Sequence, residues 1–189
     1  MTARVKHPPP ALFLVGLVLL SGCIFSPDRK KAVPPPPLPE YLEPISPQNV
    51  LQNLIASYVA RDSIETKVVY DIDYKGTSSD PSQPTPLPEF TRAIEVSHVH
   101  RLKVDPNIVS VLLDLGAPGT WQLLDGNSSD PLGSKIIQIN SQTVRIEDIT
   151  VTTYVSTNQV MEYAFKPTAV PGAPADRDTT WQVIRWKEL

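Results

Sequence analysis

The stretch S-P-Q-N-V-L-Q-N-L-I-A-S-Y-V-A-R-D, residues 46–62, is the most regular part of the sequence. A hydroxyl residue followed by proline is typical of a helix N-cap and of the first helical position. From Val50 to Val59 the large apolar side chains fall within half of a helical wheel, and polar or small ones occupy the other half. The stretch therefore predicts an amphipathic helix of about fourteen residues with one face on a core.

Two further helices are predicted downstream of this stretch. Asp62 followed by Glu65 is typical of a capped helix start, and this helix must be short because residues 68–74 have the composition of a strand. Residues 76–88 are rich in proline and serine, which predicts a loop. Between 89 and 103 a helical period returns, with an apolar stripe at four-residue spacing: Phe90, Ile94, His98 and Leu102.

The second half of the chain is typical of strands. The predicted strands are 108–115, 135–140, 144–155, 159–166 and 180–187. A break near Asp148 could divide the third, and a hairpin turn at 156–158 would lead into the fourth. Helices followed by hairpin-connected strands predict an α+β domain with a largely antiparallel sheet. In 108–115 and 180–187 both alternating faces carry apolar residues, so we expect both faces of these strands to be shielded from water. Loop 116–134 or a second subunit would cover the outer face.

The last strand holds two tryptophans that are five residues apart. Because side chains alternate along a strand with a period of two, Trp181 and Trp186 are expected on opposite faces of the sheet. Trp181 would share its face with Val183, and Trp186 with Ile184.

Both ends of this region resemble a known domain type. The helix S-P-Q-N-V-L-Q-N-L ending in Ala60-Arg61-Asp62, and the closing W-Q-V-I-R-W of 181–186, resemble the first helix and last strand of nuclear-transport-factor-2-like domains, also called polyketide-cyclase-like. The resemblance covers residues 46–189 and is shared with small bacterial lipoproteins. It implies a strongly curved sheet wrapped around the N-terminal helices, a cone-shaped barrel with an apolar pocket. It also implies a convex face through which relatives often form dimers.

The N-terminus is typical of an exported protein. Residues 1–22 combine a basic start with an uncharged apolar run at 11–20, too short to cross a bilayer, and predict a signal peptide. The segment Leu20-Ser21-Gly22-Cys23 resembles the bacterial lipobox. That resemblance implies that Cys23 carries acyl chains such as palmitate and begins the mature protein. Ile24, rather than aspartate, points to the outer membrane and to a domain facing the periplasm.

An alternative interpretation makes Cys23 a small apolar residue of an ordinary signal peptide. It leaves unexplained why the sole cysteine of the chain stands at this position. Residues 23–45 would form a lipidated linker, and the prolines between 27 and 44 favour an extended chain. Residues 46–189 would form the folded domain. The lipid bilayer is an expected partner, which the protein would contact through acylated Cys23.

Composition excludes several functions. The chain has 17 Lys and Arg against 20 Asp and Glu, and residues 1–22 remove further basic groups, so nucleic acid is not an expected partner. A single cysteine excludes disulfides and thiolate metal sites. His98 and His100 point to different sides of a helix, so no metal site is expected. No phosphate-binding or dinucleotide motif occurs, and we expect no cofactor.

The candidate site residues belong to the expected pocket. Enzymes of the resembled fold place Asp, His or Tyr inside the cone, and His98 on the apolar stripe is the candidate general acid or base. No Asp or Glu stands at a spacing that marks it as a partner of His98, and the interpretation that the residues favour is a histidine hydrogen-bonded within the core. The candidate pocket lining comprises Tyr58, Ile94, His98, Tyr154 and Tyr163.

Three functions are compatible with these features. The first is a membrane-tethered, non-enzymatic module that binds a small apolar ligand or an envelope protein, with a homodimer among the expected assemblies. The second is a lyase, isomerase or hydrolase of the cone fold with His98 as acid or base. The third is a purely structural envelope lipoprotein whose pocket is filled. The volume and lining of the pocket distinguish them.

Overall fold

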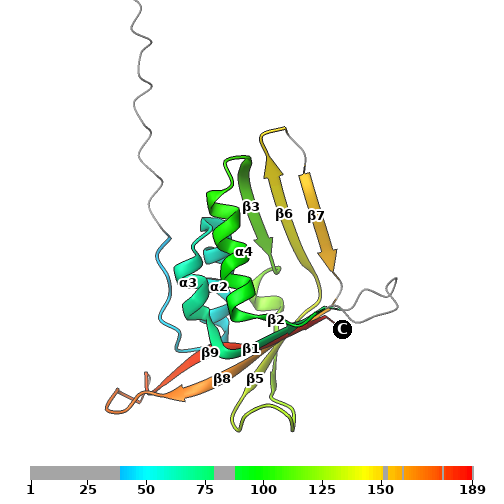
Figure 1. Ribbon diagram of the computed structural model, residues 1–189. Coiled ribbons are helices and arrows are strands. Elements are labelled where there is room, and N and C mark those ends of the chain that lie inside the picture. The colour runs from blue at the N-terminus through cyan, green and yellow to red at the C-terminus, as the bar shows by residue number, and fades with distance from the viewer. Residues whose placement is uncertain (1–38, 79–87, 151–152, 159, 176, 189) are drawn as a thin grey trace, which may run out of the picture. The chain divides into compact units, whose positions relative to one another are not determined.

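The computed structural model describes residues 39–78, 88–150, 153–158, 160–175 and 177–188 (Figure 1). The signal peptide, the lipobox with Cys23, most of the linker and the centre of the loop expected at 76–88 lie outside the described residues. Within the described part of the chain, no helix combines the length and apolar character that a membrane span requires.

The predicted first helix is confirmed. Helix α2 spans Pro47–Ala60, and the Ser46 hydroxyl at its N-cap accepts the backbone N–H of Asn49 at 3.1 Å. It ends at Arg61, which adopts the left-handed conformation (φ 54°), and the Arg61 guanidinium donates to the backbone oxygen of Ile108 at 2.9 Å. This long-range bond joins the end of α2 to the start of the first long strand of the second half.

The predicted second helix is also confirmed, but it is longer than expected. Helix α3 spans Ser63–Val69, and the Asp62 carboxylate caps it by accepting the N–H groups of Ile64 and Glu65 at 3.0 and 3.2 Å. Val68 and Val69, assigned to a strand from their β-branched side chains, therefore complete the helix. Val69 is buried, so packing against the core outweighs the modest helix propensity of valine.

Helix α4 spans Arg92–Val104, but it buries a different face from the one predicted. The buried side chains are Val99 and Leu102, whereas Ile94 is 42% exposed. Phe90 belongs to the short strand β2 (Phe90–Thr91), ahead of the helix. The stripe of Phe90, Ile94, His98 and Leu102 is therefore wrong as a core face, because its first member is not helical and cannot set the rotation of the helix.

The strands form two sheets. The six-stranded sheet has the order β2-β1-β9-β8-β5-β4, and the three-stranded sheet the order β3-β6-β7. The bounds are β1 Tyr70–Thr77, β3 Ile108–Asp114, β4 Gln122–Asp125, β5 Lys135–Ile139, β6 Gln142–Asp148, β7 Thr153–Asn158, β8 Met161–Ala169 and β9 Thr179–Glu188. Every pairing is antiparallel except β1 with β9.

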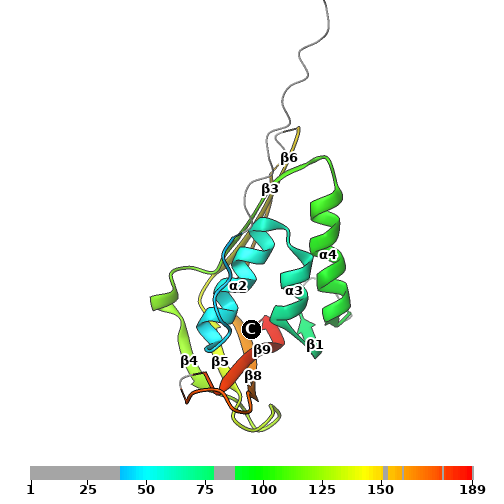
Figure 2. The same ribbon diagram turned by 90° about the vertical axis from the view of Figure 1, so that its left-hand side faces the viewer.

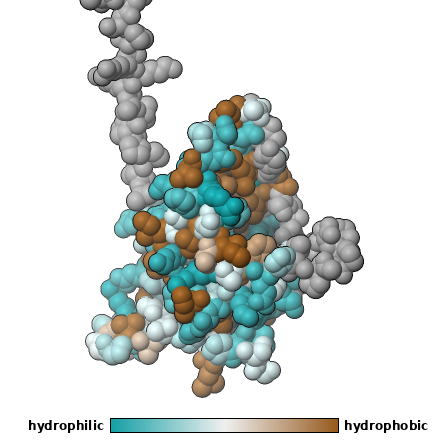
Figure 3. Space-filling model, viewed as in Figure 1, coloured by the Kyte–Doolittle hydropathy of each residue, from teal (hydrophilic) through white to brown (hydrophobic). Residues whose placement is uncertain are grey.

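The architecture is the predicted α+β fold. Helices α2, α3 and α4 lie on one side of the curved strands, as the two perpendicular views show (Figures 1 and 2). The sheet is not closed into a barrel, since the strand orders end at β2 and β4 in one sheet and at β3 and β7 in the other. Apolar side chains gather beside α4, over β3 and β6 (Figure 3).

The predicted hairpin at 156–158 is wrong. These residues belong to β7, which pairs with β6, where Ser156 lies opposite Val144. β8 pairs instead with β5 and β9 in the other sheet. The predicted break near Asp148 is confirmed, because β6 ends at Asp148, whose carboxylate accepts the N–H of Thr150 at 2.8 Å. Strand β4 was also missed inside the loop expected at 116–134.

A β-bulge overturns the prediction for the two tryptophans. Tyr163 lies opposite Trp186 and Phe165 lies opposite Val183, so Ile184 is an extra residue in β9. Tyr163 and Phe165 share one face of β8, and directly paired residues share a face across an antiparallel pair. Val183 and Trp186 therefore lie on the same face, and Trp181, two residues before Val183, joins them. Both tryptophans pack against the core.

Residues ahead of the predicted boundary at Ser46 are attached to the domain. The Tyr41 hydroxyl donates to the Asp62 carboxylate at 3.0 Å, and the Leu42 backbone exchanges two 2.8 Å hydrogen bonds with the Asn53 side chain. The backbone N–H of Trp181 donates to the backbone oxygen of Pro44 at 2.8 Å. The contacts of the domain thus reach back to Tyr41.

Candidate functional site

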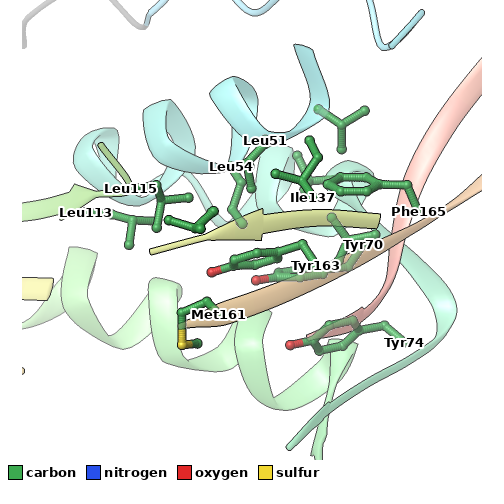
Figure 4. Close-up of a cluster of buried hydrophobic side chains, with 14 residues drawn as sticks. Leu51, Leu54, Tyr70, Tyr74, Leu113, Leu115, Ile137, Met161, Tyr163 and Phe165 are labelled. Carbon is green, nitrogen blue, oxygen red and sulfur yellow. The ribbon is translucent and has the colours of Figure 1, made fainter. Parts of the chain in front are cut away.

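A cavity of about 180 Å³ lies next to the core, between α2, α4 and the strands. Six aromatic side chains contribute to its wall: Tyr58, Tyr70, Tyr74, Phe90, Tyr163 and Trp186. The aliphatic part of the wall consists of Leu54, Leu113 and Val144, and the remaining polar part of Glu95, His98 and Gln142. Three of the tyrosines are fully or almost fully buried, and Figure 4 shows the hydroxyls of Tyr70, Tyr74 and Tyr163 on the same side of the core cluster.

The Glu95 carboxylate is the acidic group of this cavity. It projects from the first turn of α4 and accepts the Tyr58 hydroxyl of α2 at 2.6 Å through Oε2. Its other oxygen accepts the Tyr74 hydroxyl of β1 at 3.4 Å, a long and weaker contact. Helix α2, helix α4 and strand β1 therefore converge on one carboxylate.

No cation of the described chain neutralises Glu95. The ion pairs among the described residues involve other carboxylates, such as Asp71 with Lys166 and Glu162 with Arg185. His98, one helical turn further along α4, contributes to the same cavity wall but forms no ion pair with Glu95 in the described contacts. The carboxylate is thus hydrogen-bonded but not paired in charge.

The tyrosine hydroxyls around Glu95 are held in the protonated form. Burial raises the pKa of Tyr58 well above its ordinary value, and the Glu95 charge with its hydrogen bond raises it further. Burial and the same charge raise the pKa of Tyr74, Tyr70 and Tyr163. These hydroxyls therefore act as hydrogen-bond donors at neutral pH and not as bases.

The deeper end of the cavity contains a second polar pair. The Tyr163 hydroxyl donates to the Gln142 side-chain oxygen at 2.7 Å, and both residues are buried. The indole N–H of Trp186 is near enough to oppose the rise in the pKa of Tyr163, yet within the described residues it has no acceptor at hydrogen-bond geometry. Trp186 also packs edge-on against Phe90, with ring centroids 6.2 Å apart.

Gly76 of β1 is required by this close packing. A methyl group at its Cα would come within 2.5 Å of the Tyr74 hydroxyl oxygen and within 3.2 Å of both Phe90 and Trp186. Any side chain here would displace the aromatic wall of the cavity.

The structure brings together three of the five lining residues proposed from sequence. Tyr58, His98 and Tyr163 line the cavity, although the His98 side chain is exposed; Ile94, which is 42% exposed, does not line it. The backbone of Tyr154 lies in β7, but its side chain lies outside the described part. Cys23, with Leu20, Ser21 and Gly22, also lies outside it.

Sequence reasoning missed Glu95 and the β1 tyrosines. The spacing Glu95-x-x-His98, three residues apart on a helix, was a usable signal, since such residues share a helix face. It was overlooked because the assumed stripe placed Glu95 beside the core face. In the described part of the chain, no three His, Cys, Asp or Glu side chains gather as metal ligands.

Comparison with known proteins finds likeness in structure and none in sequence families. No family model and no curated protein matches the chain. A conserved protein from Planctomyces limnophilus superposes with a TM-score of 0.52 at 8% identity, covering 75% of this chain and 91% of that one. What the two chains share is the fold.

Other solved structures resemble the chain more weakly. ActVI-ORFA from Streptomyces coelicolor gives a TM-score of 0.46 at 13% identity, over 74% of this chain and 90% of that one. A protein with a ketosteroid isomerase-like fold from Catenulispora acidiphila gives a TM-score of 0.41 at 8% identity, over 74% of this chain and 83% of that one. The structural neighbours are thus nuclear-transport-factor-2-like and ketosteroid isomerase-like folds.

Proposed function

We propose that the chain is a bacterial envelope lipoprotein whose domain binds a small, largely apolar ligand in the cavity without transforming it. The observation that supports binding is the cavity itself, which is lined by six aromatic side chains and has a volume of about 180 Å³. The wall leaves apolar and aromatic surface uncovered, which a bound ligand would remove from water.

The size of the cavity limits the ligand. An apolar cavity of roughly 150 Å³ is known to hold benzene, so a volume of about 180 Å³ suits a molecule of about one ring. A steroid-sized or polycyclic ligand would extend beyond this volume.

A second candidate function is acid–base catalysis, a lyase, isomerase or hydrolase. The specific observation in its favour is that Glu95 and His98 line the same cavity. Against it, both Glu95 oxygens already accept tyrosine hydroxyls. These two hydrogen bonds hold the carboxylate in place and use part of its acceptor capacity, and the remaining acceptor positions stay open to a bound ligand, so we favour binding.

The remaining parts of the proposal concern assembly. We place the mature protein at the outer membrane, anchored through acylated Cys23 and facing the periplasm, on the strength of the lipobox resemblance. We also retain a homodimer or an envelope protein partner on the outer face of β3-β6-β7. There Leu112 and Val155 are 44% and 58% exposed, and both lie opposite Arg145.

Filling the cavity should abolish binding. Val144→Phe places a ring into the cavity wall, and we expect it to remove the saturation-transfer NMR signal of benzyl alcohol that the parent protein gives. The matched control is Val109→Phe on the neighbouring strand β3, where the side chain is 56% exposed, and it should keep the signal. Equal signals from both variants would mean that the probe binds elsewhere. Conversion of the probe during the measurement would favour the enzyme.

Removing the lipobox cysteine should abolish anchoring. Cells that express Cys23→Ser should accumulate a precursor of unchanged length that takes up no labelled palmitate, because no other thiol exists in the chain. Ser26→Ala, three residues further along, should be processed and labelled normally. Labelling of the Cys23→Ser protein would refute the lipoprotein assignment while leaving the cavity argument intact.

A further inference from the structure

We propose that the ligand of this cavity is a small organic ammonium ion, a single positive charge on an apolar body of about one ring. The inference rests on the proposed function, since it specifies the ligand of the same cavity. Two independent features of the cavity support it: an uncompensated carboxylate and a wall of aromatic faces.

The carboxylate is the first feature. The Tyr58 and Tyr74 hydroxyls satisfy hydrogen-bond acceptors of Glu95, but a hydroxyl supplies no net charge. Glu95 is half-buried. A partly desolvated carboxylate without a counter-charge costs free energy, which a neighbouring cation would lower. Within the described chain no lysine or arginine takes this place. A ligand ammonium group would supply the missing charge and N–H donors.

The aromatic wall is the second feature. The face of an aromatic ring carries partial negative charge and attracts a cation within about 6 Å, most strongly when water is excluded. Tyr70 and Tyr74 are tilted by 42° with centroids 4.2 Å apart, and Phe90 stands edge-on to Trp186. The rings of the wall thus differ in orientation, and a cation seated among them would lie close to several aromatic rings.

The same features disfavour other ligands. An anionic ligand would meet the Glu95 charge and the negative ring faces. A neutral apolar ligand would gain burial but leave the carboxylate uncompensated. Discrimination by charge, in the order cation, neutral molecule, anion, is therefore the measurable consequence of the proposal.

The test compares how tightly three one-ring probes of similar shape bind to the full-length protein. We expect benzylamine, which is charged at neutral pH, to bind at least about tenfold more tightly than benzyl alcohol, and benzoate not to bind. Titrations followed by ligand NMR or calorimetry give the dissociation constants. Glu95→Gln, which keeps an acceptor for Tyr58, should reduce the preference for benzylamine over benzyl alcohol to within about twofold.

A matched variant controls for surface charge. Glu89→Gln removes a carboxylate that is half-exposed and pairs with Lys75 at 3.3 Å, and it should leave the order of the three probes unchanged. Tyr58→Phe should retain or increase the preference for benzylamine, because it frees a Glu95 oxygen for the ammonium group. If Glu95→Gln fails to fold, the order of affinities for the three probes, measured with the parent protein and with Tyr58→Phe, tests the proposal.

The outcomes separate the two proposals. Equal binding of benzylamine and benzyl alcohol by the parent protein would overturn the ammonium inference while the binding function stands. A preference for benzylamine that survives Glu95→Gln would also overturn it, since the charge would act from elsewhere. If none of the three probes binds, the proposed function itself fails.

Discussion

Replacing Phe165 by alanine is expected to lower the free energy of unfolding by about 3–5 kcal/mol, the range for truncation of a fully buried aromatic ring. Phe165 lies in β8 with 0% exposure, opposite Val183 of β9, which is also fully buried. β8 and β9 are the two central strands of the six-stranded sheet and are paired on both sides, so we expect the space left by the ring to collapse only in part. Urea unfolding followed by circular dichroism measures the loss.

The control for this substitution lies on the exposed side of β1. Ile72 is 67% exposed, and Ile72→Ala should change the free energy of unfolding by no more than about 0.5 kcal/mol. A loss below about 1 kcal/mol for Phe165→Ala would mean that β8 is not the centre of the core.

Replacing Arg185 by methionine is expected to cost a similar amount, about 3–5 kcal/mol, because it leaves two carboxylates without their cation. Arg185 donates to Glu162 at 2.5 Å and to both oxygens of Asp130 at 3.1 Å. The Asp130 side chain is 4% exposed and the Glu162 side chain 13%. Burial disfavours the charged guanidinium, but the hydrogen bond to Glu162 and the Asp130 charge outweigh it and raise the pKa of Arg185.

A surface arginine provides the comparison. Arg145 pairs with Glu147 at 2.7 Å, but its side chain is 49% exposed, so Arg145→Met should cost no more than about 1 kcal/mol. Adding Asp130→Asn and Glu162→Gln to Arg185→Met should recover much of the loss. No recovery would show that the cost comes from lost packing and not from unpaired charge.

The helices illustrate how far local reasoning reaches. The caps of α2 and α3 are interactions between residues two or three apart, Ser46 with Asn49 and Asp62 with Glu65. Such contacts are encoded entirely in adjacent sequence, so the helix starts could be predicted. The α+β class follows from the same local patterns. Which face of α4 is buried depends on contacts with other elements, and there the prediction failed.

The candidate site lies between these two cases. Tyr58, His98 and Tyr163 could be proposed because aromatic and imidazole groups at apolar positions suit a pocket wall. Glu95 could not be identified as its centre, because its two donors come from other elements, 37 residues away in the chain for Tyr58 and 21 for Tyr74. Residues so far apart in the sequence are not related by the periodicity of a helix or a strand, so no sequence pattern indicates their contact.

The sequence by itself determined the α+β class, the starts of α2 and α3 and the largely antiparallel pairing, since each depends on neighbours within a few residues. Only the tertiary structure decided that the sheet stays open, that β7 and β8 belong to different sheets, and that a bulge at Ile184 brings Trp181 and Trp186 to one face. A single extra residue reverses the alternation of side chains, and its energy depends on the partner strand. The cavity around Glu95 has the same origin, because it exists only where two helices and the curved sheet meet.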